Sequence, residues 1–237
     1  MCDSAISLSK ADTASSWCAS QRRRCIDVAA ATFGLVVLSP LIVVICAAIL
    51  VSSGSPIFFV QRRAGRDGVE FPLLKFRTMK VSVRRGSGLT REGDSRVTAI
   101  GRLLRKSKLD ELPQLVNVLK GEMSLVGPRP DLREFWNQAA PEHRRVLNLT
   151  PGITGAASLA FSREEKLLAQ VPAEDLTTFY LEELLPAKAR LDIEYAAQAT
   201  FLSDCRILLR TVSLPLIRWW QTAENANEME TDEQISR

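Results

Sequence analysis

The chain has 237 residues, 46% of them hydrophobic, and a net charge of +4, which is enough for one large or two small domains with a buried core. His143 is the single histidine, so catalytic triads and multi-histidine metal centres are excluded. The five cysteines are scattered without a CxxC pair, which excludes a disulfide framework and a cysteine-rich zinc site.

The N-terminal part combines a polar segment with a long apolar one. Residues 1–21 are rich in serine and alanine and lack periodicity, so we expect them to be disordered. Three arginines follow at 22–24, and an apolar stretch then runs from 28 to 51. As a helix, this stretch is about 36 Å long, enough to cross a hydrocarbon core of about 30 Å.

Ser39-Pro40 interrupts this stretch at its midpoint. Proline removes a backbone hydrogen bond, and each half, at about 18 Å, is too short to cross alone. Arginines flank both ends, at 22–24 and 62–66, which places both ends on the cytoplasmic side. A re-entrant helix over 22–52, broken at Ser39-Pro40, satisfies both observations. A straight-through helix is the alternative, because spanning helices tolerate proline.

A basic β-hairpin is predicted next, with strands at 56–61 and 71–77 around a glycine-rich turn at 65–68. Lys75 and Arg77 alternate with apolar residues, so we expect them on one face of the second strand, either solvated or binding an anion. Residues 60–108 hold 14 Lys/Arg against 4 Asp/Glu, which favours an anionic partner. Residues 81–96 are predicted to form a loop.

Two adjacent carboxylates, Asp110 and Glu111, follow a short basic helix predicted at 98–106. Pro113 suits the first turn of the next helix, which we expect to end at Gly121. Acidic residues at a helix start are often simple caps. A helix start also favours phosphate, and the basic segment upstream makes a functional role the alternative to capping.

Arg129 lies between Pro128 and Pro130, which restrict the backbone on both sides of its guanidinium. This arrangement suits bidentate recognition of phosphate, although a surface arginine in a proline-rich turn would have the same sequence. Residues 151–155 carry two glycines and are predicted to form a turn.

Helices are predicted from residue 163 onward, over 174–185, 187–202 and 204–220. Residues 214–220 combine aliphatic side chains, an arginine and two tryptophans, which is typical of interfacial segments or of a core helix. The acidic tail at 223–237 is expected to be disordered. The predicted fold is therefore α+β and mostly helical: a membrane-embedded helix-break-helix and a cytosolic body over 53–222 with a short β-hairpin and amphipathic interfacial helices.

Taken in order, these segments resemble the bacterial initiating sugar transferases, the small monotopic phosphoglycosyl transferases. The resemblance runs from about residue 22 to 155, and the helical part up to about 212 also fits. Its matching stretches are 24–51 with the Ser39-Pro40 break, 61–79 ending in Lys-Phe-Arg-Thr-Met, 94–98, 109–114, 120–130 and 151–155.

The resemblance implies transfer of a sugar-1-phosphate from a UDP-sugar to polyprenyl (undecaprenyl) phosphate, with release of UMP. It implies that Asp110 is the nucleophile, that Glu111 binds Mg²⁺, and that Pro128-Arg129-Pro130 contacts the nucleotide. It also implies that the broken helix stays in the cytoplasmic leaflet of the bacterial inner membrane, among membrane lipids, which makes 53–222 the catalytic domain.

Repulsion between Asp110 and a diphosphate has to be neutralised in such a reaction. Mg²⁺ on Glu111, together with Lys75, Arg77, Arg105 and the helix N-terminus, would do so. Asp192 is a further candidate for a supporting role. The chain departs from many relatives at 156–159, where Ala-Ala-Ser-Leu replaces Trp-Ala-Gln-Val, so the sequence does not identify the sugar.

Other functions compatible with the pattern are a non-enzymatic membrane protein that binds anionic lipid or nucleotide, and a hydrolase that passes through an aspartyl phosphate. Nucleic acid is not an expected partner, because aromatic residues are nearly absent between 80 and 108. A homodimer is compatible with the sequence.

Overall fold

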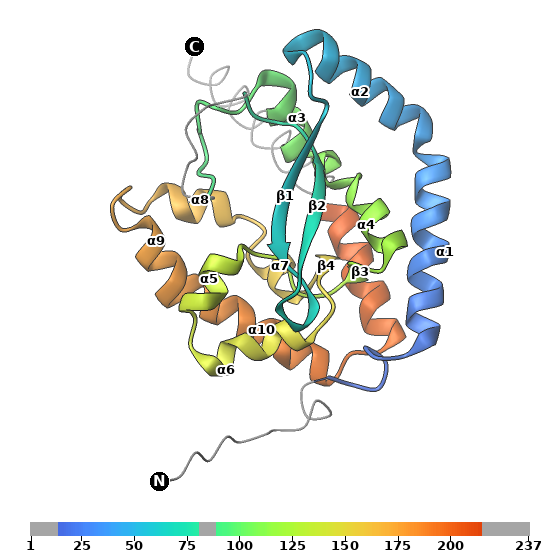
Figure 1. The fold of residues 1–237 in the computed structure, drawn as a ribbon, viewed down its shortest axis with the longest axis vertical. Coiled ribbons are helices and arrows are strands. Elements are labelled where there is room, and N and C mark those ends of the chain that lie inside the picture. The colour runs from blue at the N-terminus through green and yellow to red at the C-terminus, as the bar shows by residue number, and fades with distance from the viewer. Residues whose placement is uncertain (1–13, 81–88, 215–237) are drawn as a thin grey trace, which may run out of the picture.

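The computed structural model describes residues 14–80 and 89–214, in which helices surround two small sheets (Figure 1). Helices α1 and α2 form one edge of the molecule, and the β1–β2 hairpin crosses its middle. The other helical elements are α3 (Ala99–Lys106), α4 (Gln114–Lys120), α5 (Arg133–Gln138), α6 (Pro141–Arg144), η4 (Arg145–Asn148), α7 (Ala156–Ala160), α8 (Glu164–Ala169), α9 (Leu176–Phe179), η5 (Tyr180–Leu184) and α10 (Leu185–Ala197).

The predicted break in the apolar segment is confirmed as a bend. Helix α1 (Gln21–Val37) meets α2 (Ser39–Ser53) at an angle of 61°. Pro40 has no N–H for the carbonyl of Val36, and the hydroxyl of Ser39 donates to that carbonyl instead, at 2.8 Å. Within the described residues, only the two helices together, and neither alone, have the length and apolar composition of a membrane span.

The predicted hairpin is confirmed, with shifted strand ends. Strand β1 (Phe58–Ala64) pairs with β2 (Glu70–Phe76) in an antiparallel register that runs from Phe58↔Phe76 to Ala64↔Glu70. The connection is a 3₁₀ turn, η2 (Arg66–Gly68).

A second, parallel sheet replaces the turn predicted at 151–155. Strand β3 (Ser124–Val126) pairs with β4 (Gly152–Thr154), and the N–H of Gly152 also donates to the carbonyl of Pro128 at 2.8 Å. A Cβ atom on Gly152 would collide with the backbone of Gly127, so only glycine permits this approach. The small sheet therefore fixes the backbone that leads into Pro128-Arg129-Pro130.

The disorder predicted for residues 1–21 is wrong from residue 14 onward. Ser15 donates its N–H to Ala196 at 2.7 Å and its hydroxyl to Ala199 at 2.8 Å, and the indole N–H of Trp17 donates to Asp204 at 2.8 Å. A single tryptophan in a polar segment supplies an anchor that composition does not reveal. Residues 1–13, part of the predicted loop (81–88), nearly all of 214–220 and the acidic tail at 223–237 lie outside the described residues.

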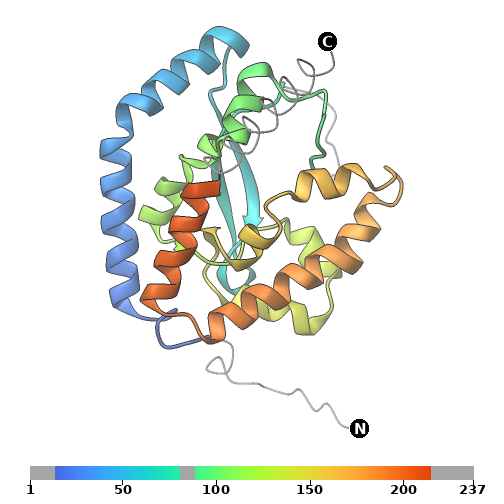
Figure 2. The ribbon, with the colours of Figure 1, turned by 180° about the vertical axis from the view of Figure 1, so that it is seen from behind.

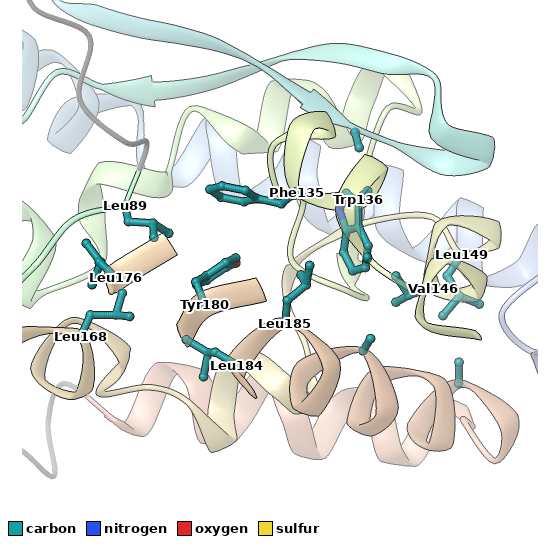
Figure 3. Close-up of a cluster of buried hydrophobic side chains, with 14 residues drawn as sticks. Leu89, Phe135, Trp136, Val146, Leu149, Leu168, Leu176, Tyr180, Leu184 and Leu185 are labelled. Atoms are coloured by element: carbon teal, nitrogen blue, oxygen red, sulfur yellow. The ribbon is translucent and has the colours of Figure 1, made fainter. Parts of the chain in front are cut away.

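The helices predicted at 174–185 and 187–202 form one nearly continuous helical run, α9–η5–α10, with a π-helical turn before Pro186. The run ends at Ala197, before the predicted end at 202. Its Tyr180, Leu184 and Leu185 pack against Phe135 and Trp136 in the larger core (Figure 3). A last helix occupies 201–214 and lies alongside α1 (Figure 2). The structure therefore agrees with the predicted α+β, mostly helical class.

Candidate active site

Asp110 and Glu111 lie in a short 3₁₀ turn, η3 (Leu109–Glu111), between α3 and α4. Lys108 precedes the turn in the left-handed conformation, with φ of 60°. Asp110 is 6% exposed and Glu111 is 8% exposed. Pro113 is the N-cap of α4 and no side chain makes a capping hydrogen bond there, so simple capping does not explain the two carboxylates.

Two cations hold the carboxylate of Glu111. Lys75, on β2, lies 3.2 Å from its Oε1. Arg129 donates to both oxygens, at 2.5 Å to Oε1 and 3.3 Å to Oε2. Burial alone would raise the pKa of Glu111, but the charges of Arg129 and Lys75 and the hydrogen bond from Arg129 hold that pKa well below its usual range. Glu111 is therefore ionised at neutral pH.

Asp110 has the opposite environment. Burial, and then the charge of Glu111, raise its pKa, and the charges of Lys75, Lys108 and Arg105 only partly oppose this. Its Oδ1 is buried and has no hydrogen-bond partner in the structure. An oxygen that accepts no hydrogen bond keeps its lone pairs for attack on an electrophile, and a raised pKa makes the carboxylate more basic.

Arg77, Arg105 and Asp192, the other charged residues predicted for the site, contact other parts of the protein. Arg77 donates to the carbonyls of Ser53 and Gly54, at 2.7 and 2.5 Å, and so ties the end of α2 to the hairpin. Arg105 donates to Thr78 at 2.9 Å and to Glu165 at 3.1 Å, and acts on Asp110 through its charge alone.

Asp192, on α10, accepts the N–H of Ala157 at 2.9 Å. Burial raises the pKa of Asp192 to about 6. This bond joins α10 to the first turn of α7, within the segment where the chain departs from many relatives. Lys75 and Arg129 are thus the predicted binding residues that the structure brings into direct contact with the carboxylate pair.

The family model of the bacterial sugar transferases matches residues 18–218. The chain belongs to this family. The match extends from the N-terminal turn, across the bent helix pair and the carboxylate site, and beyond the last described helix.

Relatives of this sugar transferase differ in the sugar that their names give. A Caulobacter vibrioides UDP-glucose:undecaprenyl-phosphate glucose-1-phosphate transferase is 37% identical over 198 residues, which cover 81% of this chain and 68% of the relative. The Bacillus subtilis sugar transferase EpsL is 42% identical over 68% of this chain and 81% of its own length. An Aeromonas hydrophila N-acetylgalactosaminephosphotransferase is 39% identical over 58% of this chain and 33% of the relative.

A small pocket opens beside the carboxylate pair of the sugar transferase. It is lined by Arg63, Leu73, Lys75, Gln114, Arg129 and Pro130. Sequence reasoning missed three of these residues, Arg63, Leu73 and Gln114. All three lie in the stretches that match the family, 61–79 and 109–114, but none was predicted as a site residue. Arg63 was treated as a charge flanking the membrane segment, Leu73 as part of a strand and Gln114 as part of a helix. The position of Gln114, three residues after Glu111, was a usable signal.

Carboxylates are the available metal ligands at this site. Among residues 14–80 and 89–214, no group of three or more His, Cys, Asp or Glu side chains is placed to hold a metal ion by itself. Mg²⁺ usually binds one or two carboxylates and completes its shell with water and substrate phosphates. The adjacent Asp110 and Glu111, one of them with an unpartnered oxygen, fit this mode of binding.

Proposed function

We propose that the protein transfers a sugar-1-phosphate from a UDP-sugar to undecaprenyl phosphate and releases UMP, as the first membrane step of bacterial glycoconjugate assembly. Family membership and the names of the relatives support the reaction class. The observation that carries the proposal is the pairing of Asp110, which has an unpartnered buried oxygen, with Glu111, which Lys75 and Arg129 hold ionised.

In the first step, an oxygen of Asp110 attacks the phosphorus that bears the sugar. A bond forms between this oxygen and phosphorus, the bond between phosphorus and the bridging oxygen breaks, and UMP leaves with the electron pair. The product is an acyl phosphate on Asp110, which divides one transfer into two steps. The water-soluble donor and the lipid acceptor then need not bind together.

In the second step, a phosphate oxygen of undecaprenyl phosphate attacks the same phosphorus. The bond to Asp110 breaks and the carboxylate is restored, while the lipid becomes a diphosphate-linked sugar. Both steps bring negative charges together, so stabilisation by fixed cations is the main requirement. Lys75 and Arg129 contact Glu111, next to the reacting carboxylate. The charges of Lys75 and of Arg105, on α3, also act on Asp110.

We propose Mg²⁺ as the cofactor, with Glu111 as its protein ligand and Asp110 beside it. When bound, the ion would withdraw charge from the diphosphate. In the described structure, Lys75 and Arg129 share the charge of Glu111. Both side chains are therefore placed to contact phosphate oxygens that approach the same carboxylate.

We also propose a location on the cytoplasmic face of the inner membrane, with α1 and α2 inserted from one side. Their outward faces expose large apolar side chains, which would otherwise contact water. These are Phe33, Val36, Val37, Val43, Val44, Leu50 and Val51. The last described helix adds Phe201, Leu202, Leu209 and Val212, which suits a helix lying at the membrane surface.

The test is UMP release from a panel of UDP-sugars with Mg²⁺ and undecaprenyl phosphate, for the wild type and Asp110→Asn. We expect release with one or a few sugars, dependent on the lipid and lost in the variant, and a phosphosugar on Asp110 by mass spectrometry. Release without lipid would instead indicate a hydrolase. Turnover that survives in Asp110→Asn would exclude Asp110 as the nucleophile.

A further inference from the structure

Gln114 is a buried polar residue that the proposed mechanism does not use. It is the first residue of α4 and only 2% exposed, and its amide nitrogen Nε2 has no hydrogen-bond partner in the structure. A buried donor without an acceptor destabilises the fold, so a buried amide of this kind is expected to meet an acceptor in the working protein. Gln114 lines the pocket beside Glu111.

Arg63, on β1, lines the same pocket and also has a buried nitrogen without a hydrogen-bond partner. Its Nε is buried and unpartnered, and its one described ion pair, to Asp131, is long at 3.7 Å. Burial lowers the pKa of Arg63, with the charge of Asp131 opposing this shift. Two N–H groups from different elements, Nε of Arg63 and Nε2 of Gln114, thus lack acceptors in residues that face one pocket.

The charges around the pocket identify the kind of acceptor. The lining of the pocket contains three cations and no carboxylate. The cations are Arg63, Lys75 and Arg129, and the other lining residues are Leu73, Gln114 and Pro130. The nearby carboxylates are Asp110, Glu111 and Asp131. Glu111 is already paired with Lys75 and Arg129. Asp131 is already paired with Arg63 and with Lys188, which lies outside the lining. A ligand with several oxygens and a negative charge would accept hydrogen bonds from both unpaired donors and would also contact the cations of the lining.

We propose that Gln114 and Arg63 bind a phosphate group of a substrate in this pocket, with Gln114 donating through its amide and Arg63 through Nε. This assignment rests on the proposed function. Two substrates carry a suitable group: the nucleotide donor and the lipid phosphate acceptor. Lys75 and Arg129 contact Glu111 and also line the pocket, so a phosphate there lies next to the carboxylate pair.

The experiment uses the full-length protein in detergent or nanodiscs with two substitutions at one position. Gln114→Glu keeps the shape but replaces the donor with a carboxylate, and Gln114→Met removes the donor without adding charge. Gln138→Glu, on the exposed side of α5, is the matched control for the added charge. Arg63→Gln tests the second donor. Thermal unfolding is measured with UMP, inorganic phosphate and uridine as separate probes, because a ligand that binds the folded state raises the midpoint.

We expect UMP and inorganic phosphate, but not uridine, to stabilise the wild type and Gln138→Glu. The stabilisation should be lost in Gln114→Glu and reduced in Gln114→Met and Arg63→Gln. Equal stabilisation by uridine, or unchanged stabilisation in both Gln114 variants, would overturn the proposal.

Kinetics identify which substrate supplies the phosphate. In a two-step mechanism, kcat/KM for each substrate reports its own step. A fall of about 10- to 100-fold in kcat/KM for the UDP-sugar alone in Gln114→Glu assigns the pocket to the donor, and a fall for the lipid alone assigns it to the acceptor. Unchanged values for both contradict the proposal. Failure of the proposed function would give a different result, namely no UMP release by the wild type. In that case, thermal stabilisation by inorganic phosphate still tests whether the pocket binds phosphate.

Discussion

Asp110 and Glu111 are consecutive buried carboxylates whose pKa values are shifted in opposite directions. Burial acts on both, but Arg129 and Lys75 contact only Glu111. The ionised Glu111 then adds its repulsion to the burial of Asp110. The two carboxylates therefore suit different roles. Glu111 remains a fixed anion, while Asp110 is more basic and has an unpartnered oxygen suited to attack.

Asp110→Asn should abolish turnover and stabilise the fold. The substitution removes a buried charge that has no partner on Oδ1 and that is repelled by Glu111. Relief of such a group is worth about 1–3 kcal/mol. Thermal and denaturant unfolding of the wild type and the variant at pH 8 would measure this. A variant that is both inactive and less stable would indicate that Asp110 makes contacts that support the fold.

Glu111→Gln should abolish turnover and destabilise the fold. Lys75 and Arg129 would lose their shared anion, and breaking a buried pair from one side costs about 3–5 kcal/mol. The two cations are partly exposed, so we expect about 2–3 kcal/mol. Glu165→Gln is the matched control, because it breaks the surface pair with Arg105 and should cost less than about 1 kcal/mol.

The difference in unfolding free energy between the wild type and Glu111→Gln should depend on pH in one direction. The pKa of Glu111 is lowered in the folded state, so its contribution is complete above its unfolded pKa, near 4.5, and declines as pH falls through the folded value. The stability gap between the wild type and Glu111→Gln should therefore be constant from pH 6 to 8 and close in acid. A gap that widens on acidification would contradict the ion pairs as its cause.

Local patterns in the sequence predicted the elements that depend on neighbouring residues. Ser39-Pro40 predicted the bend, because proline acts within one helical turn, and alternation around 65–68 predicted the hairpin. The pattern Pro-Arg-Pro predicted a restrained arginine. Its partner Glu111 lies 18 residues earlier in the chain, and this contact depends on the β3–β4 sheet.

Long-range packing explains what the sequence did not predict. Strand β4 has three residues and begins at a glycine, so it is too short to show the apolar–polar alternation that predicts a strand. Arg77 is two residues after Lys75 and was predicted to share its face, yet its side chain binds the end of α2 instead of the carboxylates. In the described part of the polar segment, residues 14–20, Trp17 contacts Asp204, which lies far along the chain. Each of these outcomes depends on a residue far away in the chain.

Asp192→Asn should stabilise the protein at neutral pH. Burial raises the pKa of Asp192 to about 6, from 3.8 in the unfolded chain, so the folded state is penalised as pH rises through this interval. The penalty is complete above about pH 6 and amounts to about 3 kcal/mol at most. Asparagine keeps an acceptor for the N–H of Ala157 but carries no charge, and we expect a net gain of about 1–2 kcal/mol.

Unfolding midpoints from pH 4 to 8 would test this. The difference between Asp192→Asn and the wild type should be near zero at pH 4 and grow to its full value by pH 7. Glu194→Gln, on the exposed side of the same helix, should show no such growth. An equal difference at all pH values would mean that packing, and not the charge, separates the two proteins.

Pro40→Ala should shift α1 and α2 from the proposed re-entrant arrangement toward a spanning one. Alanine restores the N–H that can donate to the carbonyl of Val36, which Ser39 now satisfies through its hydroxyl. A reporter cysteine at position 52, near the end of α2, is introduced into a chain without its native cysteines. With the proposed re-entrant topology, we expect this cysteine in the wild type to be protected from a membrane-impermeant thiol reagent applied from the periplasm. Labelling should rise in Pro40→Ala.

Ser39→Ala is the matched control, because it removes the hydroxyl but keeps the proline, so the bend and the protection should persist. Arg77 also holds the end of α2, through the carbonyls of Ser53 and Gly54. The double variant Pro40→Ala, Arg77→Met should therefore label more than Pro40→Ala, since both the bend and its attachment to the hairpin are lost. Equal labelling in all four proteins would show that neither the proline nor Arg77 determines the topology, and strong labelling already in the wild type would mean that the bent pair crosses the membrane.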